Sequence, residues 1–226
     1  TLFAFACLAG CAAPKTGILV MAHGGDPEWN RDVESTVAPL RDTQAVEIAF
    51  GMATTSTIRD AVARLETQGV RKVAVVRMFI SGDSFIEPTE YILGLRESLP
   101  EDPHAAHAAQ ATGHEDHSGH HMEAPERIGT NASFVLSRHG VAESPLIDEI
   151  LADRVRALST DPRKESVLLL AHGPGDDSEN QRWLANMKLR ARRIHDVGPF
   201  RDVRCETLRE DWPEKRVASE ARIRAF

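Results

Sequence analysis

The stretch 18-ILVMAHG-24 returns almost unchanged as 167-VLLLAHG-173, and this repeat is the strongest indication of the fold. In each copy a short apolar run, typical of a strand buried in a parallel sheet, ends in Ala-His-Gly. The two histidines, His23 and His172, lie about one domain length apart. Ligands usually bind at the carboxyl ends of such strands. The repeat therefore predicts two related α/β units, each contributing one histidine to a shared site.

Apolar runs alternate with segments of helical periodicity on both sides of the repeat. We expect strands at 17–22, 45–50, 72–80, 133–137, 166–171 and 202–208. We expect helices between them, the first opened by Asp26-Pro27 and the others at 58–65, 89–99, 144–158, 179–197 and from 214 onward. This alternation predicts parallel sheets with helices on both faces. The helix at 144–158 should bury Leu146, Ile147, Ile150, Leu151, Val155 and Leu158.

The expected fold class is α/β, with two tandem open, mainly parallel sheets. Residues 17–160 form the first domain, interrupted at 100–131 by an exposed insertion rich in Ala, His, Gly, Glu and Pro. Residues 161–226 form the second domain, which we expect to be incomplete because its strand–helix pattern stops within a helix.

The N-terminal residues 1–16 resemble the tail of a lipoprotein signal sequence. Leu8-Ala9-Gly10-Cys11 matches a bacterial lipobox and follows an apolar run that is too short to span a bilayer. One interpretation is a lipidated Cys11 that attaches the protein to a membrane of the cell envelope. The alternative is a leader upstream of a mistaken start, followed by a cytoplasmic protein.

Composition excludes some classes of function. The 226 residues are 42% hydrophobic and 27% charged, with a formal net charge of −7 and no basic run, so nothing favours nucleic acid. The three cysteines, Cys7, Cys11 and Cys205, provide neither a disulfide framework nor a zinc motif. Cys205 is expected to be a buried small apolar residue.

His23 and the glycines after it, Gly24 and Gly25, are the first candidate site. A neutral imidazole binds divalent transition metals and titrates near physiological pH, and glycines allow close approach of a flat ligand. The alternative is a histidine satisfied by a backbone carbonyl at the edge of the sheet. For His172 a vestigial copy is a further alternative.

The insertion holds six histidines within eighteen residues, namely His104, His107, His114, His117, His120 and His121. Their spacings allow chelation, so we expect loose capture or delivery of a divalent transition metal. The alternative is a low-complexity linker that binds metal only in the test tube.

The loop after the third strand, Ser81-Gly82-Asp83-Ser84, leads to Glu87. Because strands one and three of an open sheet can end at one cleft, Glu87 is a candidate proton acceptor or metal ligand near His23. The alternative is a surface carboxylate at the start of a helix.

These motifs together resemble a known family. The opening from Ala22 to Asn30 (AHGGDPEWN) and the loop at 78–87 resemble the cobalt-type sirohydrochlorin chelatases, class II enzymes with the ferrochelatase fold. The resemblance implies insertion of Co²⁺, Ni²⁺ or Fe²⁺ into a tetrapyrrole, with the metal as a substrate and no organic cofactor. It implies roles for His23, which matches the family's first-strand histidine and would bind the metal or accept protons, and for Glu87, which matches its acidic position after the third strand. We further expect His172 to share the catalytic role and Gly24, Gly25 and Ser84 to contact the ring.

One departure from the family matters. The family usually carries a histidine where this chain has Ser84, and a hydroxyl is a poor metal ligand and a poor base at neutral pH. The alternative function is therefore an exported metal- or tetrapyrrole-binding lipoprotein without turnover. A serine hydrolase centred on Gly82-Asp83-Ser84 is disfavoured because no Asp-x-x-His follows and no Gly-x-Ser-x-Gly elbow is present.

Overall fold

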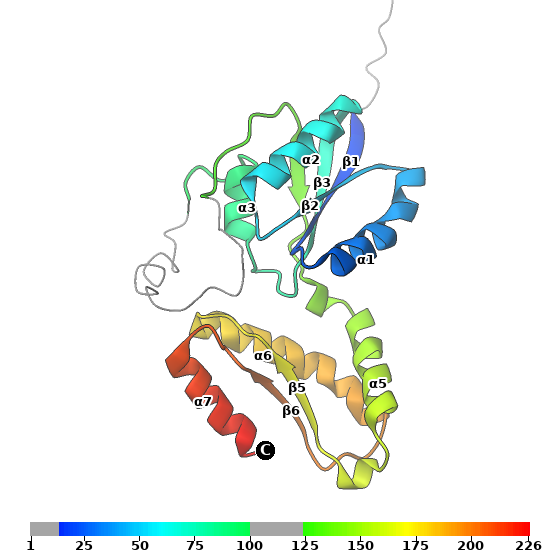
Figure 1. Cartoon of the computed structure of the whole chain (residues 1–226), viewed down its shortest axis with the longest axis vertical. Coiled ribbons are helices and arrows are strands. Elements are labelled where there is room, and N and C mark those ends of the chain that lie inside the picture. Colours follow the sequence, from blue (N-terminus) through cyan, green and yellow to red (C-terminus); the bar gives the residue numbers. More distant parts are fainter. Residues whose placement is uncertain (1–13, 100–123) are drawn as a thin grey trace, which may run out of the picture. The chain divides into compact units, whose positions relative to one another are not determined.

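The computed structural model describes residues 14–99 and 124–226, which fall into two compact units (Figure 1). Unit 1 comprises residues up to Met78 and Phe85–Ser137, and unit 2 comprises Phe79–Ser84 and Arg138–Phe226. The helix at 144–158, counted with the first domain on the basis of the repeat, thus lies in unit 2. The lipobox and the six clustered histidines lie outside the described residues.

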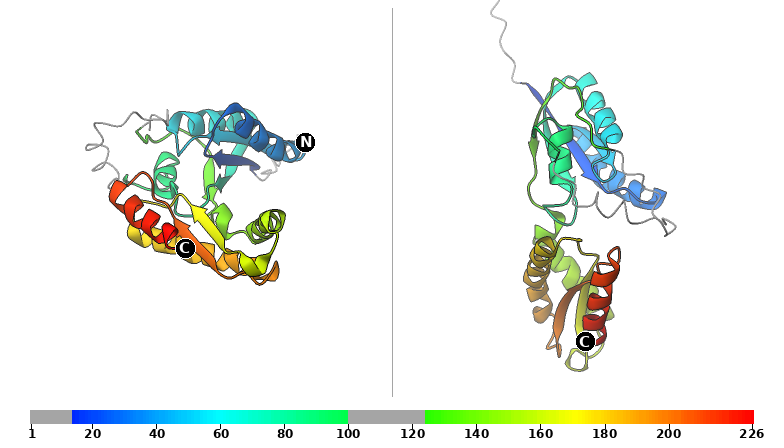
Figure 2. Two further views of the ribbon diagram at one scale, coloured as in Figure 1. Left: turned by 60° about the horizontal axis from the view of Figure 1, so that its bottom comes forward. Right: turned by 90° about the vertical axis from the view of Figure 1, so that its left-hand side faces the viewer.

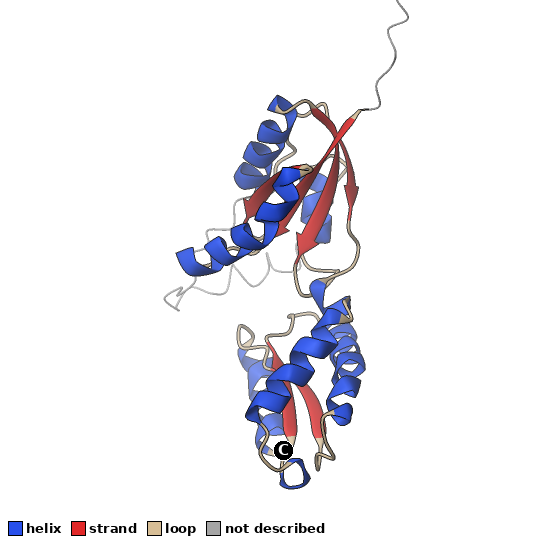
Figure 3. Cartoon of the chain, turned by 90° about the vertical axis from the view of Figure 1, so that its right-hand side faces the viewer, coloured by secondary structure: helices blue, strands red, loops and turns tan. Residues whose placement is uncertain are grey.

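Unit 1 holds a four-stranded, fully parallel sheet of order β2-β1-β3-β4. Its elements, in chain order, are β1 (Lys15–Ala22), α1 (Pro27–Val37), η1 (Ala38–Asp42), β2 (Ala45–Phe50), α2 (Thr55–Thr67), β3 (Val70–Met78), α3 (Ile86–Ile92) and β4 (Ser133–Leu136). The predicted parallel α/β architecture with helices on both faces is confirmed (Figure 3).

The central strand β1 is buried on both faces because helices cover both. Val20 and Ala22 pack with Val33 and Val37 of α1, in a cluster that also includes Val46 and Ile48 of β2. On the opposite face, Gly17 leaves room for α2, since a Cβ there would lie 3.1 Å from the Leu65 side chain. This continuous burial explains why the first copy of the repeated phrase is almost wholly apolar.

Helix α1 begins where the sequence predicts. The Asp26 side chain accepts hydrogen bonds from the backbone N–H groups of Glu28 and Trp29, both at 2.9 Å, and Pro27 occupies the first helical turn. These contacts satisfy two of the N–H groups that a helix leaves without intrahelical partners.

Helix α3 differs from the prediction of a helix at 89–99. It begins at Ile86, since Pro88 fits the first turn, where its missing N–H would have had no helical partner. It ends at Ile92, and Gly94 then takes a positive φ of 73°.

The last part of the predicted exposed insertion is packed onto unit 1. Ile128 is buried, and its N–H donates to the Ile92 carbonyl at 2.9 Å. The Glu66 carboxylate accepts a hydrogen bond from the Asn131 N–H at 2.9 Å. Most residues of 124–131 are exposed, as expected for the insertion, and the buried Ile128 with a few hydrogen bonds fixes this stretch to unit 1.

Unit 2 contains the parallel pair β5 (Val167–Ala171) and β6 (Val203–Thr207). The other elements are η2 (Val141–Glu143), α5 (Leu146–Leu158), η3 (Pro162–Lys164), α6 (Asp177–Ala191), η4 (Arg192–Asp196) and α7 (Pro213–Arg224), as two further views show (Figure 2). Its core gathers around Ala191, Ile194 and Cys205. The predicted burial of Cys205 is confirmed.

Helix α5 buries less of its apolar surface than predicted. Leu146, Ile150 and Leu158 are exposed, Ile147, Leu151 and Val155 are partly buried, and Ala152 is its one fully covered side chain. The helix packs against α6 and η4, so one narrow stripe is covered rather than the whole apolar face. Among the described residues, no helix is both long enough and apolar enough to cross a membrane.

Candidate functional site

His23 directly follows β1 and is exposed. Its Nδ1 lies 2.9 Å from the Gly24 carbonyl oxygen. The Gly51 N–H donates to the Ala22 carbonyl at 2.9 Å, which holds the ends of β1 and β2 together. Gly24 has a φ of +77°, and a side chain there would press on Phe50. The backbone contact matches the simpler interpretation of His23, while its exposure keeps the ring accessible to a ligand.

The residues after His23 form a closed turn. The Asn30 side chain accepts from the Gly25 N–H at 3.0 Å and donates to the Gly25 carbonyl at 3.3 Å. A side chain at Gly25 would meet Trp29. The segment 25–30 (GDPEWN) thus has a structural role, because its hydrogen bonds fix the backbone next to His23.

His172, at the end of β5, lies between two carboxylates. Its Nδ1 is 2.9 Å from Glu210 Oε1, and its Nε2 is 3.3 Å from Asp211 Oδ2. Both acids follow β6, the strand paired with β5. The Trp212 ring lies beside the imidazole, with the ring centroids 6.0 Å apart. About half of the His172 side chain is exposed, so a ligand can reach it.

The two carboxylates restrict what the imidazole can do. An ionised carboxylate only accepts hydrogen bonds, and an imidazole nitrogen donates only when it carries a proton, so both contacts are hydrogen bonds at once only when the ring carries two protons. A neutral ring donates to one acid and presents the lone pair of its other nitrogen to the second acid. The arrangement is therefore suited to taking up a proton.

Glu210 is the more enclosed of the two acids. Burial is the largest single effect on its pKa and acts to raise it, but the hydrogen bond from His172, a backbone hydrogen bond and the nearby charges of His172 and Arg216 together lower the net pKa. Its Oε2 is buried without a hydrogen-bond partner, whereas its Oε1 contacts His172 Nδ1.

A buried arginine fixes the distance between the two strand ends. The Arg209 N–H donates to the His172 carbonyl, at 2.6 Å, and the Arg209 guanidinium donates to the carbonyls of Pro174 and Gly175. Lys215, from α7, donates to the same Gly175 carbonyl at 2.6 Å. Arg209 has a positive φ of 55°, a conformation that costs energy for a side chain of this kind. These bonds join the loop after β5 to the loop after β6.

Sequence reasoning missed Glu210, Asp211 and Arg209. The available signal was a pair of acids directly after the strand predicted at 202–208. Unit 1 offers no counterpart in the sequence, because β2 is followed by Gly51 and Met52.

Glu87 lies in the first turn of α3, where its carboxylate accepts from Arg96 Nη2 at 2.7 Å. Its role as a proton acceptor or metal ligand stays a prediction, and that role would require the ion pair to open. Ser84 lies in the loop after β3, with its N–H donating to the Ser81 carbonyl at 3.3 Å. Its contact with a ring, like those of Gly24 and Gly25, also stays a prediction.

Within residues 14–99 and 124–226, no group of three His, Cys, Asp or Glu side chains is arranged to hold a metal ion. His172 fits this finding, because its two acids lie on opposite sides of the ring instead of converging on one point.

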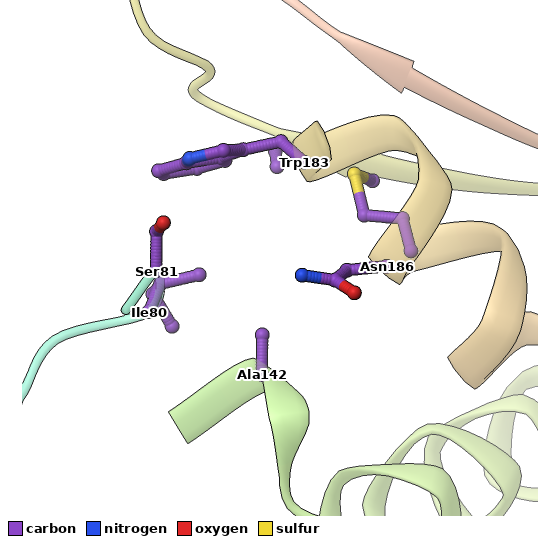
Figure 4. A pocket seen from close by; sticks show the side chains of 7 residues that line it. Ile80, Ser81, Ala142, Trp183 and Asn186 are labelled. Carbon is purple, nitrogen blue, oxygen red and sulfur yellow. The ribbon is translucent and has the colours of Figure 1, made fainter. Parts of the chain in front are cut away.

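An apolar pocket in unit 2 adjoins the end of β5. Ile80, Ser81, Ala142, Trp183 and Asn186 line it (Figure 4), together with Ala171, the residue before His172. The Trp183 ring forms one wall, and its Nε1–H donates to Glu179 at 3.3 Å. Burial raises the pKa of Glu179.

Parallel sheets layered between helices, with histidines at the ends of the first strand of each unit, define an α/β fold of the chelatase class. The fold is similar to that of SirB from Bacillus subtilis, solved with Fe³⁺, with a TM-score of 0.55 and 14% identity. The likeness covers 86% of this chain and 66% of that chain, so this chain spans about two thirds of SirB. A comparison with curated proteins found no match.

The CbiX family model matches residues 17–158. The chain belongs to the CbiX family, the sirohydrochlorin chelatase family, and the resemblance predicted from the sequence is confirmed.

Proposed function

We propose that this protein is a lyase-class metal chelatase that inserts a divalent metal ion into a sirohydrochlorin-type tetrapyrrole. Membership of the CbiX family supports the reaction class. The observation that carries the proposal is His172, which lies between Glu210 and Asp211 at the ends of two paired parallel strands.

The chemistry requires a proton acceptor. Metal insertion breaks two pyrrole N–H bonds; the electron pairs stay on nitrogen and bind the metal ion, and two protons leave. A neutral His172 that donates through Nδ1 to Glu210 can accept a proton on Nε2. The resulting imidazolium donates to Asp211 as well, so the product state of the transfer is stabilised by the second acid.

His23 is the proposed ligand that receives the metal ion, since it is exposed at the end of β1 and imidazole suits these metals. Co²⁺, Ni²⁺ and Fe²⁺ are the candidate substrates, and the histidines of the insertion would raise the local concentration of metal. Glu87 becomes available as a further acceptor only if it separates from Arg96.

The second candidate is a protein that binds metal or tetrapyrrole without turnover. Ser84 favours it, because the family's usual histidine is replaced by a hydroxyl. Attachment to the cell envelope through Cys11 belongs with this candidate, and mass spectrometry of the full-length protein from cells would detect the lipid.

Turnover distinguishes the two candidates. Purified protein is mixed with sirohydrochlorin and each of Co²⁺, Ni²⁺ and Fe²⁺, and the absorption of the ring is followed. The chelatase proposal predicts insertion faster than in buffer for at least one metal, and a loss of that gain in His172→Ala. His195→Ala, an exposed histidine of unit 2, is the matched control. Insertion rates equal to those in buffer with all three metals would rule out the chelatase and support the protein that binds without turnover.

A further inference from the structure

His139 is a third histidine that follows a parallel strand, and neither the repeat nor the family motifs draw attention to it. It comes three residues after β4, within unit 2, and its side chain is 84% exposed. Its Nδ1 lies 2.6 Å from Glu143 Oε2. A ring that donates through Nδ1 to a carboxylate presents the lone pair of Nε2 to its surroundings.

Glu143 is itself firmly placed. Its Oε1 accepts from the Gly140 N–H at 2.9 Å. That bond, then the hydrogen bond with His139, lower the pKa of Glu143 against the opposing effect of burial, so it is a carboxylate at neutral pH. The hydrogen bond from the Gly140 N–H to Oε1 closes the η2 turn and does not need the other carboxylate oxygen, Oε2. The contact of Oε2 with His139 orients the imidazole.

The turn that carries His139 is joined to the loop after β3. The N–H groups of Val141 and Ala142 donate to the carbonyls of Phe79 and Ile80, at 2.8 and 3.0 Å. A side chain at Gly140 would collide with the backbone of that loop, so glycine is required at this crossing. His139 is thus held beside the loop that contains Ser84, where the family's usual histidine is missing.

Residues close in the chain to His139 and to His172 line the same apolar pocket. One wall is Ala142, which lies between His139 and Glu143 in the chain, and another is Ala171, which precedes His172. The Trp183 ring and the Ile80 side chain provide further apolar lining of the pocket (Figure 4). Each of these two walls is therefore a short stretch of chain away from a histidine that is paired with a glutamate.

We propose that His139 is a second catalytic residue, which accepts a proton from a pyrrole nitrogen while its Nδ1–H stays bonded to Glu143. The inference rests on the proposed chelatase function. Two protons must leave the ring, and two oriented imidazoles provide one acceptor for each. In each transfer a pyrrole N–H bond breaks, the electron pair remains on nitrogen for the metal ion, and an Nε2–H bond forms. Water then takes the proton from the imidazolium.

The test measures steady-state insertion of Co²⁺ by the full chain, comparing His139→Ala, His139→Gln and the control His195→Ala. We expect both His139 variants to lower kcat by about 10²-fold or more, with KM unchanged, and His195→Ala to match wild type. Added imidazole should restore part of the rate of His139→Ala, which a merely structural role would not allow. Circular dichroism melts show whether the variants are folded.

A second measurement does not depend on turnover. The NMR signal of the His139 Cε1–H should shift when metal-free sirohydrochlorin is added, while that of His195 should not. An active wild type with His139 variants as fast as His195→Ala, or an unmoved His139 signal, overturns the role of His139 and leaves the chelatase function standing. If the wild-type protein inserts metal no faster than buffer does, both the chelatase function and the role of His139 are refuted.

Discussion

At the scale of single residues, Arg209 determines how the candidate site is held. Arg209→Ala leaves the Pro174 carbonyl without its donor and the Gly175 carbonyl with Lys215 alone, so we expect a loss of about 1–3 kcal/mol in the free energy of unfolding. Urea titration measures it, with the exposed Arg163→Ala as a control. A stability equal to that of the control would show that the arginine does not join the two loops.

Glu165 gives a pH test at the same scale. Hydrogen bonds from the Ser159 hydroxyl and the N–H groups of Asp161 and Thr160 lower its pKa to about 2. Because the folded-state pKa lies below the ordinary value of 4.5, its stabilising contribution is present above pH 4.5 and is lost as the pH falls towards 2.

Glu165→Gln should therefore have a lower Tm than wild type at pH 7, and the difference should shrink between pH 4.5 and 2. Thermal melts across this range check it, with the exposed Glu214→Gln as the control. A Tm difference that does not vary with pH would contradict the assignment.

How far the site could be predicted varies from residue to residue. His23 and His172 could be predicted from the repeated phrase, because a histidine directly after a buried parallel strand lies at the edge of the sheet where ligands usually bind. Glu210 and Asp211 could not be predicted in this way, because they reach His172 only through the pairing of β6 with β5, and the sequence does not show which strands pair. His139 was hidden because β4 ends before an irregular turn and not in a repeated phrase.

At the scale of elements, α1 offers the cleanest test of local sequence signals. Asp26→Ala removes two hydrogen bonds to the helix N-terminus and should cost about 0.5–2 kcal/mol in the free energy of unfolding. Asp32→Ala, within the same helix and exposed, should be neutral or slightly stabilising, since alanine favours helices. Chemical denaturation of both variants checks the difference, and equal stabilities would refute the cap.

Elements were predicted well where periodicity and caps agreed. Strand β2 and the start of α1 are where the sequence placed them. The predicted position of α3 was wrong because Pro88 was interpreted as a residue that precedes the helix, whereas it lies in the first turn. The burial of α5 was overestimated because an apolar stripe shows only which side chains a helix can bury. The area that is buried depends on the neighbouring elements, here α6 and η4.

At the scale of the whole molecule, the two sheets differ in how their first strands are held. β1 is paired on both sides, with β2 and β3, whereas among the described residues β5 is paired with β6 alone. Amide hydrogen exchange should therefore be slowest for the central residues of β1, such as Leu19, and faster for those of β5, such as Leu169. Equal protection of the two strands would contradict the described pairing.

The central claim is that the carboxylate-bound histidine of unit 2 takes part in metal insertion. Stopped-flow absorption of sirohydrochlorin mixed with Co²⁺ and the protein tests it most directly, in a full chain whose six insertion histidines are replaced by asparagine. We expect conversion faster than in buffer, abolished by His172→Ala and preserved in His195→Ala. Conversion that is just as fast with His172→Ala would contradict it.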